Sequence, residues 1–244
     1  MTVIGVIPAR WGSTRFEGKV LATIAGKPMI QHVFERVKMC RSVDQILIAC
    51  DDARVLKAAM GFGAQAIMTS AHHASGTDRI AEAVQKIKAD IVVNIQGDEP
   101  LIDPKVIDDL VKALQSDSSC SMATVIKPIE NKEDLNNPHV VKVVIDKDQN
   151  ALYFSRSPIP YNRDGQDIRF YKHLGIYAYR RDFLLTLTKL SKSFLEEAEQ
   201  LEQLRALEGG YKIKTITTDT ETIAVDTKED IKKVEAFLAN HSLQ

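Results

Sequence analysis

Short apolar runs rich in β-branched residues alternate with segments whose apolar residues recur at helical spacing through the first half of the chain. Four runs predict strands, at 3–7, 45–50, 64–68 and 91–96, and four segments predict helices, beginning at Pro28, Ala53, Thr77 and Pro104. The run at 91–96 is continuously apolar, as in a central strand covered on both faces. This alternation favours parallel strands joined by crossover helices, and therefore an α/β fold.

The pattern changes after a further predicted strand at 121–126. Strand-like runs at 140–145, 151–155 and 174–179 are separated by turns instead of long helices, which predicts a β-rich extension. Beyond it we expect a helix at 195–208, a strand at 211–217 and a last helix capped by Thr227. No internal repeat or low-complexity linker interrupts the pattern. Residues 1–244 are therefore predicted to form a single domain, with a mixed central sheet flanked by helices.

Composition and charge exclude several classes of protein. The chain has 244 residues, of which 44% are hydrophobic and 27% charged, and its formal net charge is −1. This balance is typical of a globular protein and gives no overall positive field, so no nucleic-acid partner is expected. Cys40, Cys50 and Cys120 are odd in number and form no CxxC pair, which fits reduced core thiols. Without a signal-peptide pattern or a run of about 20 apolar residues, we expect a cytoplasmic protein with no membrane insertion.

The loop after the first predicted strand carries candidate chemistry, because ligands of α/β sheets bind beyond the carboxyl ends of the strands. Three cations, Arg10, Arg15 and Lys19, are interleaved there with glycine, serine and threonine. Positive side chains and backbone N–H groups in such a loop suit a polyphosphate. A solvated surface loop is the alternative interpretation when these cations are considered alone.

Three other motifs are rejected as sites. The spacing between Gly12 and Gly18 is wrong for a Walker A loop, and Val20 stands where that motif needs serine or threonine. The GxGxxA string that begins at Gly61 follows a predicted helix, which is the wrong order for a dinucleotide-binding fold. The pair His72-His73 diverges on an extended segment without a third ligand nearby, so no zinc site is expected.

Six motifs, in the same order, resemble those of the CMP-KDO synthetases, which activate 3-deoxy-D-manno-octulosonate (KDO). They are PARxxSxRxxGK at 8–19, QGDEP at 96–100, YFSR at 153–156, KHLGIY at 172–177, LEQLR at 201–205 and VDT at 225–227. They span nearly the whole chain, and the ordered set is specific where any one motif alone is weak. The resemblance implies a nucleotide-diphospho-sugar transferase (Rossmann-like) fold and a homodimer. It also implies transfer of CMP from CTP to KDO, with release of pyrophosphate, for lipopolysaccharide biosynthesis.

The resemblance further implies a division of the chain and a set of site residues. Residues 1–127 are the CTP-binding half, 128–190 the extension for acceptor binding and dimerisation, and 191–244 the return to the main sheet. The catalytic residues are Lys19, Asp98 and Asp226, and Mg²⁺ is held by Asp98 and Asp226. The CTP-binding residues are Arg10, Ser13, Arg15, Lys19, Ser75, Gln96 and Asp98. The KDO-binding residues are Arg79, Gln96, Arg156, His173, Glu202, Gln203 and Asp226. Carboxylates suit Mg²⁺, which prefers oxygen ligands, and the cations suit a charged triphosphate.

Several of these residues have a structural alternative. Asp98 and Asp226 lie where a turn or helix cap begins, and His173 lies in an otherwise apolar strand. Arg79 also fits a helix surface, while Glu202 and Gln203 are adjacent in a predicted helix and cannot face the same way. The identity of the acceptor is open as well. Another 2-keto sugar acid, such as 8-amino-KDO or a sialic acid, is the alternative, followed by a catalytically silent nucleotide-binding homologue.

Glu17 is a departure, because the family usually has proline at this position of the proposed triphosphate loop. A carboxylate there either points away from the phosphates or pairs with Arg15 or Lys19. The loss of proline's fixed φ predicts a less preorganised loop. We therefore expect replacement of Glu17 by proline to lower the Michaelis constant for CTP.

Overall fold

The chain folds into two units whose elements follow the predicted alternation of strands and helices. The computed structural model describes residues 1–12, 16–220 and 222–241. Unit 1 contains residues 1–108 together with 221–244, and unit 2 contains residues 109–220. The functional division into 1–127, 128–190 and 191–244 stays a prediction.

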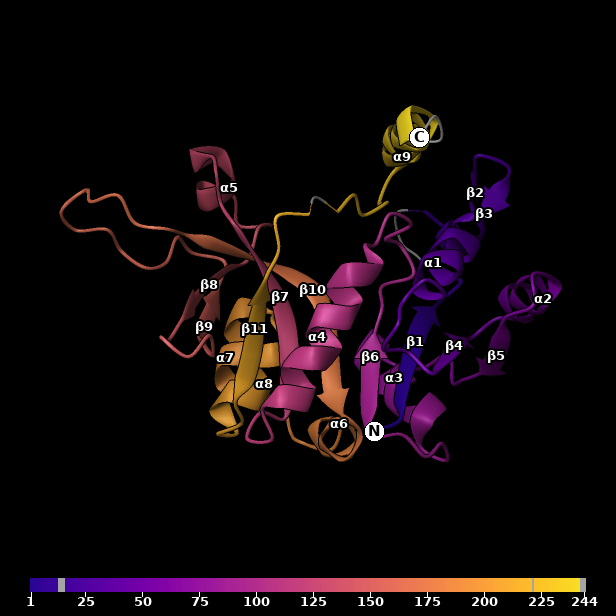
Figure 1. Ribbon diagram of the computed structural model, residues 1–244, viewed down its shortest axis with the longest axis horizontal. Helices are drawn as coiled ribbons and strands as arrows, with labels where there is room; N and C mark the ends of the chain where they lie inside the picture. Colours follow the sequence, from indigo (N-terminus) through magenta and orange to yellow (C-terminus); the bar gives the residue numbers. More distant parts are fainter. Residues whose placement is uncertain (13–15, 221, 242–244) are drawn as a thin grey trace. The chain divides into compact units, whose positions relative to one another are not determined.

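Four parallel strands form the sheet of unit 1, in the order β6, β1, β4, β5 (Figure 1). β1 (Val3–Ala9) pairs with β6 (Ile91–Asn94) on one side and with β4 (Gln45–Cys50) on the other. β4 pairs in turn with β5 (Gln65–Met68). Because Ala9 lies opposite Cys50 and Val6 lies opposite Asn94, the carboxyl ends of the three central strands meet at one edge. Loops from all three strands therefore converge there.

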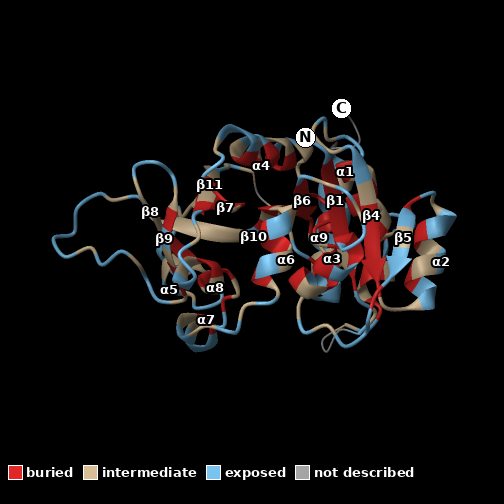
Figure 2. Cartoon of the chain, turned by 90° about the horizontal axis from the view of Figure 1, so that it is seen from below, coloured by how far each residue is buried: buried red, intermediate tan, exposed pale blue. Residues whose placement is uncertain are grey.

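Helices connect the strands of unit 1. They are α1 (Met29–Val37), α2 (Ala53–Gly61), α3 (Gly76–Val84), the start of α4 (Pro104–Ser116), α9 (Lys228–His241) and the 3₁₀ helix η1 (Lys19–Leu21). A hairpin of β2 (Thr23–Ile24) and β3 (Lys27–Pro28) precedes α1. Figure 2 shows buried residues concentrated on β1 and β4, and Val6 and Ile7 are fully buried. This core holds the strand ends in place.

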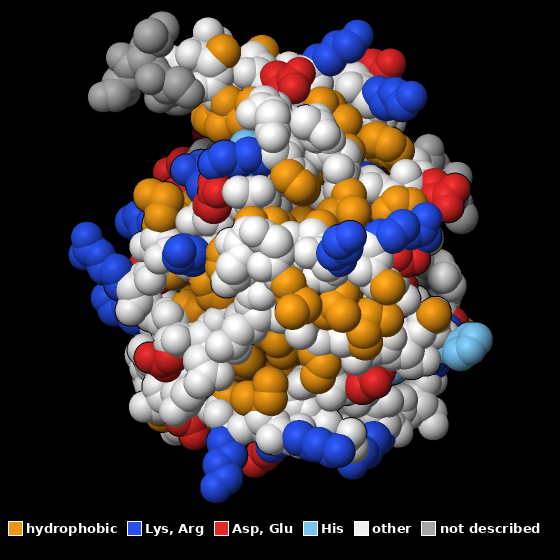
Figure 3. All heavy atoms as spheres, turned by 90° about the vertical axis from the view of Figure 1, so that its right-hand side faces the viewer, with side chains coloured by type: hydrophobic (Ala, Val, Ile, Leu, Met, Phe, Trp, Pro, Cys, Tyr) orange, Lys and Arg blue, Asp and Glu red, His pale blue; other side chains and the backbone are white. Residues whose placement is uncertain are grey.

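β5 is the outer strand of unit 1 and is much less covered than β1. Ile67 and Met68 on this strand are 38% and 43% exposed, and Met60 on α2 is 64% exposed. Figure 3 shows hydrophobic side chains gathered across the middle of the face that carries these elements, with charged side chains mostly around them. Within unit 1, β1 and β6 are therefore more deeply buried than β5.

The carboxyl-terminal segment packs against the hairpin and α1. Val225 and Val234 join Ile24, Met29 and Leu101 in one buried cluster. The Ala25 N–H also donates to a Glu235 carboxylate oxygen at 3.1 Å. This packing fixes the segment that carries Asp226 within unit 1.

Unit 2 has mixed strand pairing. β7 (Met122–Pro128) runs parallel to β11 (Ile213–Thr217) and antiparallel to β10 (Tyr171–Arg180). β8 (Lys142–Ile145) is antiparallel to both β10 and β9 (Ala151–Ser155). Its helices are the rest of α4, from Asp109 on, together with α5 (Lys132–Asn136), α6 (Arg181–Leu187), α7 (Phe194–Glu199) and α8 (Gln203–Glu208). Parallel strands in unit 1 and mixed pairing here confirm the predicted α/β class with a mixed sheet.

The single helix predicted at 195–208 is wrong, because the structure has two short helices there. α7 ends at Glu199, and the next residue, Gln200, has a left-handed backbone with φ of 54°. The Leu201 N–H closes this end by donating to the Glu196 carbonyl. Apolar spacing alone did not reveal the break, since both helices bury residues with compatible periodicity.

Among the described residues, the longest apolar stretch in any helix falls short of what a membrane crossing requires.

Candidate active site

A cavity of about 310 Å³ lies in unit 1 at the carboxyl ends of β1 and β6. The loop after β1 contributes Arg10 and Lys19 to its wall, and the loop after β6 contributes Gln96 and Asp98. The amino-terminal part of α3 and the segment before α9 complete it. The remaining lining residues are Pro8, Val20, His73, Ala74, Ser75, Gly76, Arg79, Gly97 and Asp226. The volume lies in the range of small-molecule sites.

Lys19 joins the two predicted metal-binding carboxylates. Its Nζ donates to Asp98 Oδ2 at 2.8 Å and to Asp226 Oδ1 at 3.0 Å. Burial opposes the charge on Lys19, but hydrogen bonds and Coulomb attraction from Asp98 and Asp226 outweigh it and raise its pKa. The Val225 N–H donates to the Asp98 carbonyl at 2.9 Å, so the backbone ties the two acidic segments together. Residues separated by half of the chain therefore converge on one point.

Gly97 allows this convergence. A Cβ atom at this position would lie 2.8 Å from the Pro8 carbonyl oxygen. Only glycine lets the loop after β6 lie so close to the end of β1. The glycine of the QGDEP motif thus brings Asp98 beside the cationic loop.

Glu99, the next residue, is buried and 8% exposed. Its Oε2 has no hydrogen-bond partner among the described residues. Burial, and then the charge of Asp98, raise the pKa of Glu99 to about 7. Its carboxyl group therefore has weaker acidity than an exposed glutamate.

Arg79 is buried in the cavity wall and not on a helix surface. Its guanidinium donates to Asp51 Oδ2 at 2.8 Å, to Thr69 Oγ1 at 2.7 Å and to the Ser70 carbonyl at 3.3 Å. Asp51 Oδ1 accepts from the Trp11 N–H at 2.8 Å. Asp51 therefore connects Arg79 to the loop after β1.

Ser75 caps α3 beside the cavity. Its hydroxyl accepts from the Asp78 N–H at 3.1 Å and lies 3.0 Å from Asp78 Oδ2. The first turn of α3 contributes Gly76 to the cavity wall, and helix amino termini favour anions. His73 also lines the cavity and is paired with Glu82. No group of three or more potential metal-ligating residues occurs within residues 1–12, 16–220 and 222–241.

Four predicted KDO-binding residues, Arg156, His173, Glu202 and Gln203, belong to unit 2. The Arg156 guanidinium donates to three backbone carbonyls, those of Pro138, Glu199 and Gln200. Glu202 is the residue before the first turn of α8, and Gln203 is buried, with Nε2 unpaired in the described part of the chain. An unpaired buried amide is costly in a folded protein unless a ligand or water satisfies it.

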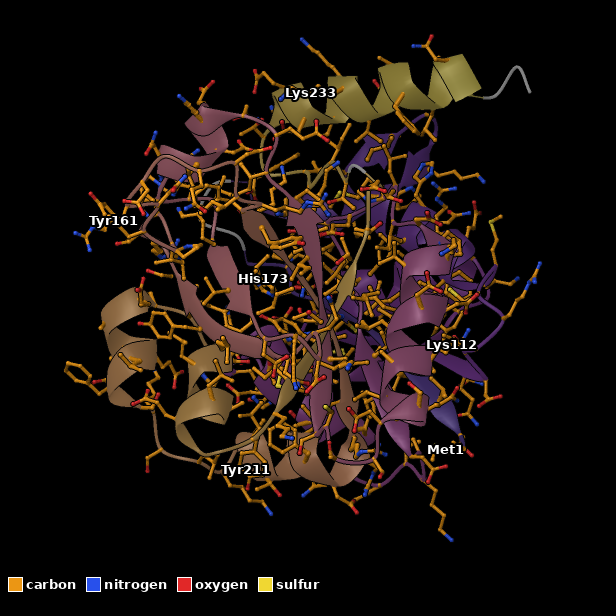
Figure 4. All side chains as sticks on the ribbon, turned by 60° about the vertical axis from the view of Figure 1, so that its left-hand side comes forward. Met1, Lys112, Tyr161, His173, Tyr211 and Lys233 are labelled. Carbon is orange, nitrogen blue, oxygen red and sulfur yellow. The ribbon has the colours of Figure 1, made fainter. Side chains whose placement is uncertain are left out.

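His173 lies on β10 within unit 2, where Figure 4 labels it, and its ring packs against Phe154 and Tyr177. Its Nε2 is 2.9 Å from Thr124 Oγ1. Burial lowers the pKa of His173 to about 3, so the imidazole is neutral. Burial raises the pKa of Tyr177 well above its ordinary value, with further contributions from Tyr179 and Glu202.

The structure thus places seven predicted residues around one cavity, namely Arg10, Lys19, Ser75, Arg79, Gln96, Asp98 and Asp226. Ser13 and Arg15 lie outside the described residues. Glu17 Oε1 accepts from the Trp11 indole Nε1–H at 2.9 Å. Sequence reasoning missed that partner, and it missed Asp51, whose position at the end of β4 was the available signal.

Comparison with known proteins places the chain among cytidylyltransferases. The profile of the family described as "Cytidylyltransferase" matches residues 4–216. A 3-deoxy-manno-octulosonate cytidylyltransferase of Syntrophobacter fumaroxidans is 52% identical, covering 100% of this chain and 99% of that protein. Another with that name, from Geotalea uraniireducens, is 50% identical and covers 96% and 98%. A solved CMP:2-keto-3-deoxy-manno-octonic acid synthetase complexed with CTP has 46% identity and a TM-score of 0.95, covering 98% of this chain and 99% of its own.

Proposed function

Because the chain belongs to the cytidylyltransferase family, we propose that it transfers CMP from CTP to the anomeric hydroxyl of KDO and releases pyrophosphate. The observation that carries the proposal is the meeting of Lys19, Asp98 and Asp226 at one cavity. Full-length similarity to relatives named for this reaction supports KDO as the acceptor. The product belongs to the route to lipopolysaccharide.

The reaction needs positioning and charge neutralisation more than a protein nucleophile. The hydroxyl oxygen of the acceptor bonds to the α-phosphorus of CTP, and the bond to the oxygen that bridges to the β-phosphorus breaks. Pyrophosphate leaves with that oxygen, and the hydroxyl proton passes to solvent or a base. Negative charge on the phosphate oxygens increases along this path, and Arg10 and Lys19 in the cavity wall can stabilise it.

The two carboxylates fit Mg²⁺. Asp98 and Asp226 each place an oxygen within 3.0 Å of the Lys19 Nζ, so one cation already lies between them. Mg²⁺ commonly takes one or two protein carboxylates and completes its shell with water and phosphate oxygens. When bound, the ion would neutralise triphosphate charge and polarise the α-phosphate. In that arrangement Lys19 would turn from the carboxylates toward the phosphates, which its flexible side chain permits.

The assignment of Arg79, Gln96 and Asp226 in unit 1 to KDO binding is a proposal, and so is that of Arg156, His173, Glu202 and Gln203 in unit 2. The unpaired buried Nε2 of Gln203 supports a polar ligand at that residue. The neutral imidazole of His173 suits a sugar hydroxyl better than a carboxylate. Arg156 already donates to three carbonyls, which favours a contribution to loop structure.

The assembly and location are proposed as a homodimer in the cytoplasm. Exposed Leu152 and Tyr161, at 60% and 88%, supply apolar surface for a contact in the predicted extension. Figure 4 shows Tyr161 at the margin of unit 2. Unpaired cysteines fit a reducing compartment.

A pyrophosphate-release assay with CTP and a panel of acceptors tests the reaction. With Mg²⁺ present, we expect the fastest release with KDO, a slower one with 8-amino-KDO and with sialic acid, and none with CTP alone. Preference for another acceptor would reassign the substrate within the same family. No release with any acceptor would contradict the proposed function.

A further inference from the structure

Trp11, the only tryptophan of the chain, is held from four directions. Its N–H donates to Asp51 Oδ1 at 2.8 Å, and its carbonyl accepts from the Gly18 N–H at 3.0 Å. Its indole Nε1–H donates to Glu17 Oε1 at 2.9 Å, and the Arg54 guanidinium lies 3.5 Å from the ring centroid. We refer to Trp11, Glu17, Asp51 and Arg54 as the Trp11 brace.

The stacked arginine of the brace is itself fixed. Arg54 Nε and one terminal nitrogen donate to the two carboxylate oxygens of Asp52, at 2.8 and 2.7 Å. Asp52 also caps α2 by accepting from the Arg54 N–H. The two-pronged contact holds the planar guanidinium in one orientation over the indole. One face of Trp11 therefore rests on the first turn of α2.

The ring of Trp11 also packs closely against the backbone beside Lys19. Gly18 has a positive φ of 66°, and a Cβ atom there would lie 2.7 Å from the indole ring. Both the backbone conformation and the lack of space require glycine. The position of the indole thus constrains the backbone immediately before Lys19.

The brace borders the cavity without lining it. Trp11, Glu17 and Arg54 are absent from the cavity wall, whereas their chain neighbours Arg10 and Lys19 belong to it. We propose that Glu17, through its hydrogen bond to Trp11, is a positioning residue that holds Arg10 and Lys19 in place for the triphosphate of CTP. This inference rests on the proposed function, which supplies the triphosphate.

Loss of the hydrogen bond leaves both cations present but less ordered. Ordering them then accompanies CTP binding and weakens it, because fixing mobile side chains and loops opposes association. The Michaelis constant for CTP rises while turnover changes little, since the bound complex regains the same geometry. A single net hydrogen bond corresponds to roughly a 2- to 10-fold effect.

The kinetic test compares four variants with the wild type. Glu17→Gln keeps an oxygen acceptor for the indole, and we expect its Michaelis constant for CTP to stay within about 2-fold of wild type. Glu17→Ala and Trp11→Phe each remove the hydrogen bond and are expected to raise the constant by roughly 2- to 10-fold, with turnover within about 2-fold. The double variant Trp11→Phe/Glu17→Ala should have a Michaelis constant for CTP no higher than that of the more impaired single variant, because both substitutions remove the same interaction.

Glu35→Ala is the matched control. Glu35 is an exposed carboxylate on α1 that contacts Lys27 and Gln31, outside the cavity wall. Glu35→Ala removes one negative charge, as Glu17→Ala does. Its Michaelis constant should therefore equal that of the wild type.

Tryptophan fluorescence tests the brace without any turnover. Since Trp11 is the only tryptophan, acrylamide quenching of its emission reports how well the indole is held and covered. Quenching should increase in Glu17→Ala and remain at the wild-type level in Glu17→Gln. If the wild type transfers no CMP, the proposed function fails, and quenching still decides whether Glu17 orders Trp11.

Three results would overturn the inference. One is an unchanged Michaelis constant in Glu17→Ala, whether or not quenching changes. Another is a Glu17→Gln variant that behaves like Glu17→Ala, because charge and not the hydrogen bond would then be responsible. The third is additive effects in the double variant.

Discussion

Asp51→Asn is the substitution for which the structure gives the sharpest expectation. The side chain of Asp51 is 11% exposed and that of Arg79 is 5% exposed, so their ion pair is largely shielded from water. Asp51 Oδ1 accepts from the Trp11 N–H and Oδ2 from Arg79, both at 2.8 Å. Asparagine has nearly the same shape but only one acceptor oxygen. Its NH₂ group must face one of these two donors.

The expected loss is a few kcal/mol. Removing one partner of a buried ion pair typically costs about 3–5 kcal/mol, because the other charge is left buried and unpaired. Arg79 keeps two neutral acceptors in the variant, Thr69 Oγ1 and the Ser70 carbonyl, which reduces that cost. We therefore expect Asp51→Asn to lower the free energy of unfolding by about 3 kcal/mol.

Urea denaturation followed by Trp11 fluorescence measures this loss in unit 1, where the only tryptophan lies. A double-mutant cycle with Arg79→Met isolates the pair, and the coupling should exceed about 1.5 kcal/mol. Glu35→Gln, at an exposed ion pair with Lys27, is the control and should cost less than about 1 kcal/mol. A loss below about 1 kcal/mol for Asp51→Asn, or a coupling near zero, would refute the reasoning.

Three further predictions concern single residues. Burial, with the nearby charges of Asp108 and Asp103, raises the pKa of Cys40 to about 12. Alkylation of this half-buried thiol at pH 8 should therefore be much slower in the native protein than in the unfolded one, and equal labelling rates would contradict this. The pKa of His173 is about 3 when folded and near 6.5 when unfolded, so only the unfolded chain gains a proton between those values. The free energy of unfolding should therefore fall as the pH drops below 6.5, by up to about 1.4 kcal/mol per unit, and His173→Gln should reduce that slope in urea titrations at several pH values. Glu17→Pro should raise the Michaelis constant for CTP, contrary to the expectation from sequence, because proline cannot accept the Trp11 hydrogen bond.

The strands and the first helices were predictable because their apolar spacing is local. The predicted run at 45–50 coincides with β4 and that at 151–155 with β9. The break between α7 and α8 was not predictable from the sequence, since it depends on a left-handed backbone at Gln200, and no glycine signals it. Lys142 is a comparable case. It is fully buried on β8 and donates to the carbonyls of Asn137, Val140 and Arg156, and no pattern of polar positions predicts such burial.

The residues of the candidate site also fall into those that the sequence located and those that it missed. Lys19 follows a predicted strand, so the rule that ligands bind at strand ends located it, and the family motifs added Asp98 and Asp226. Their mutual contact required the fold, because Lys19 and Asp226 are 207 positions apart in the chain. Asp51 and Trp11 were missed since each acts through a partner that only the folded backbone brings near. Residue type alone likewise did not reveal that Arg156 contacts backbone carbonyls.

Turnover of Asp98→Asn at limiting Mg²⁺, with CTP and KDO saturating, tests the central claim most directly. Lys19, Asp98 and Asp226 are proposed to act as one charged centre, and asparagine keeps the shape of Asp98 while removing its charge. With circular dichroism showing an intact fold, we predict a loss of turnover of about 100-fold or more, as when a group that stabilises transition-state charge is removed. Wild-type turnover in this variant would contradict the claim.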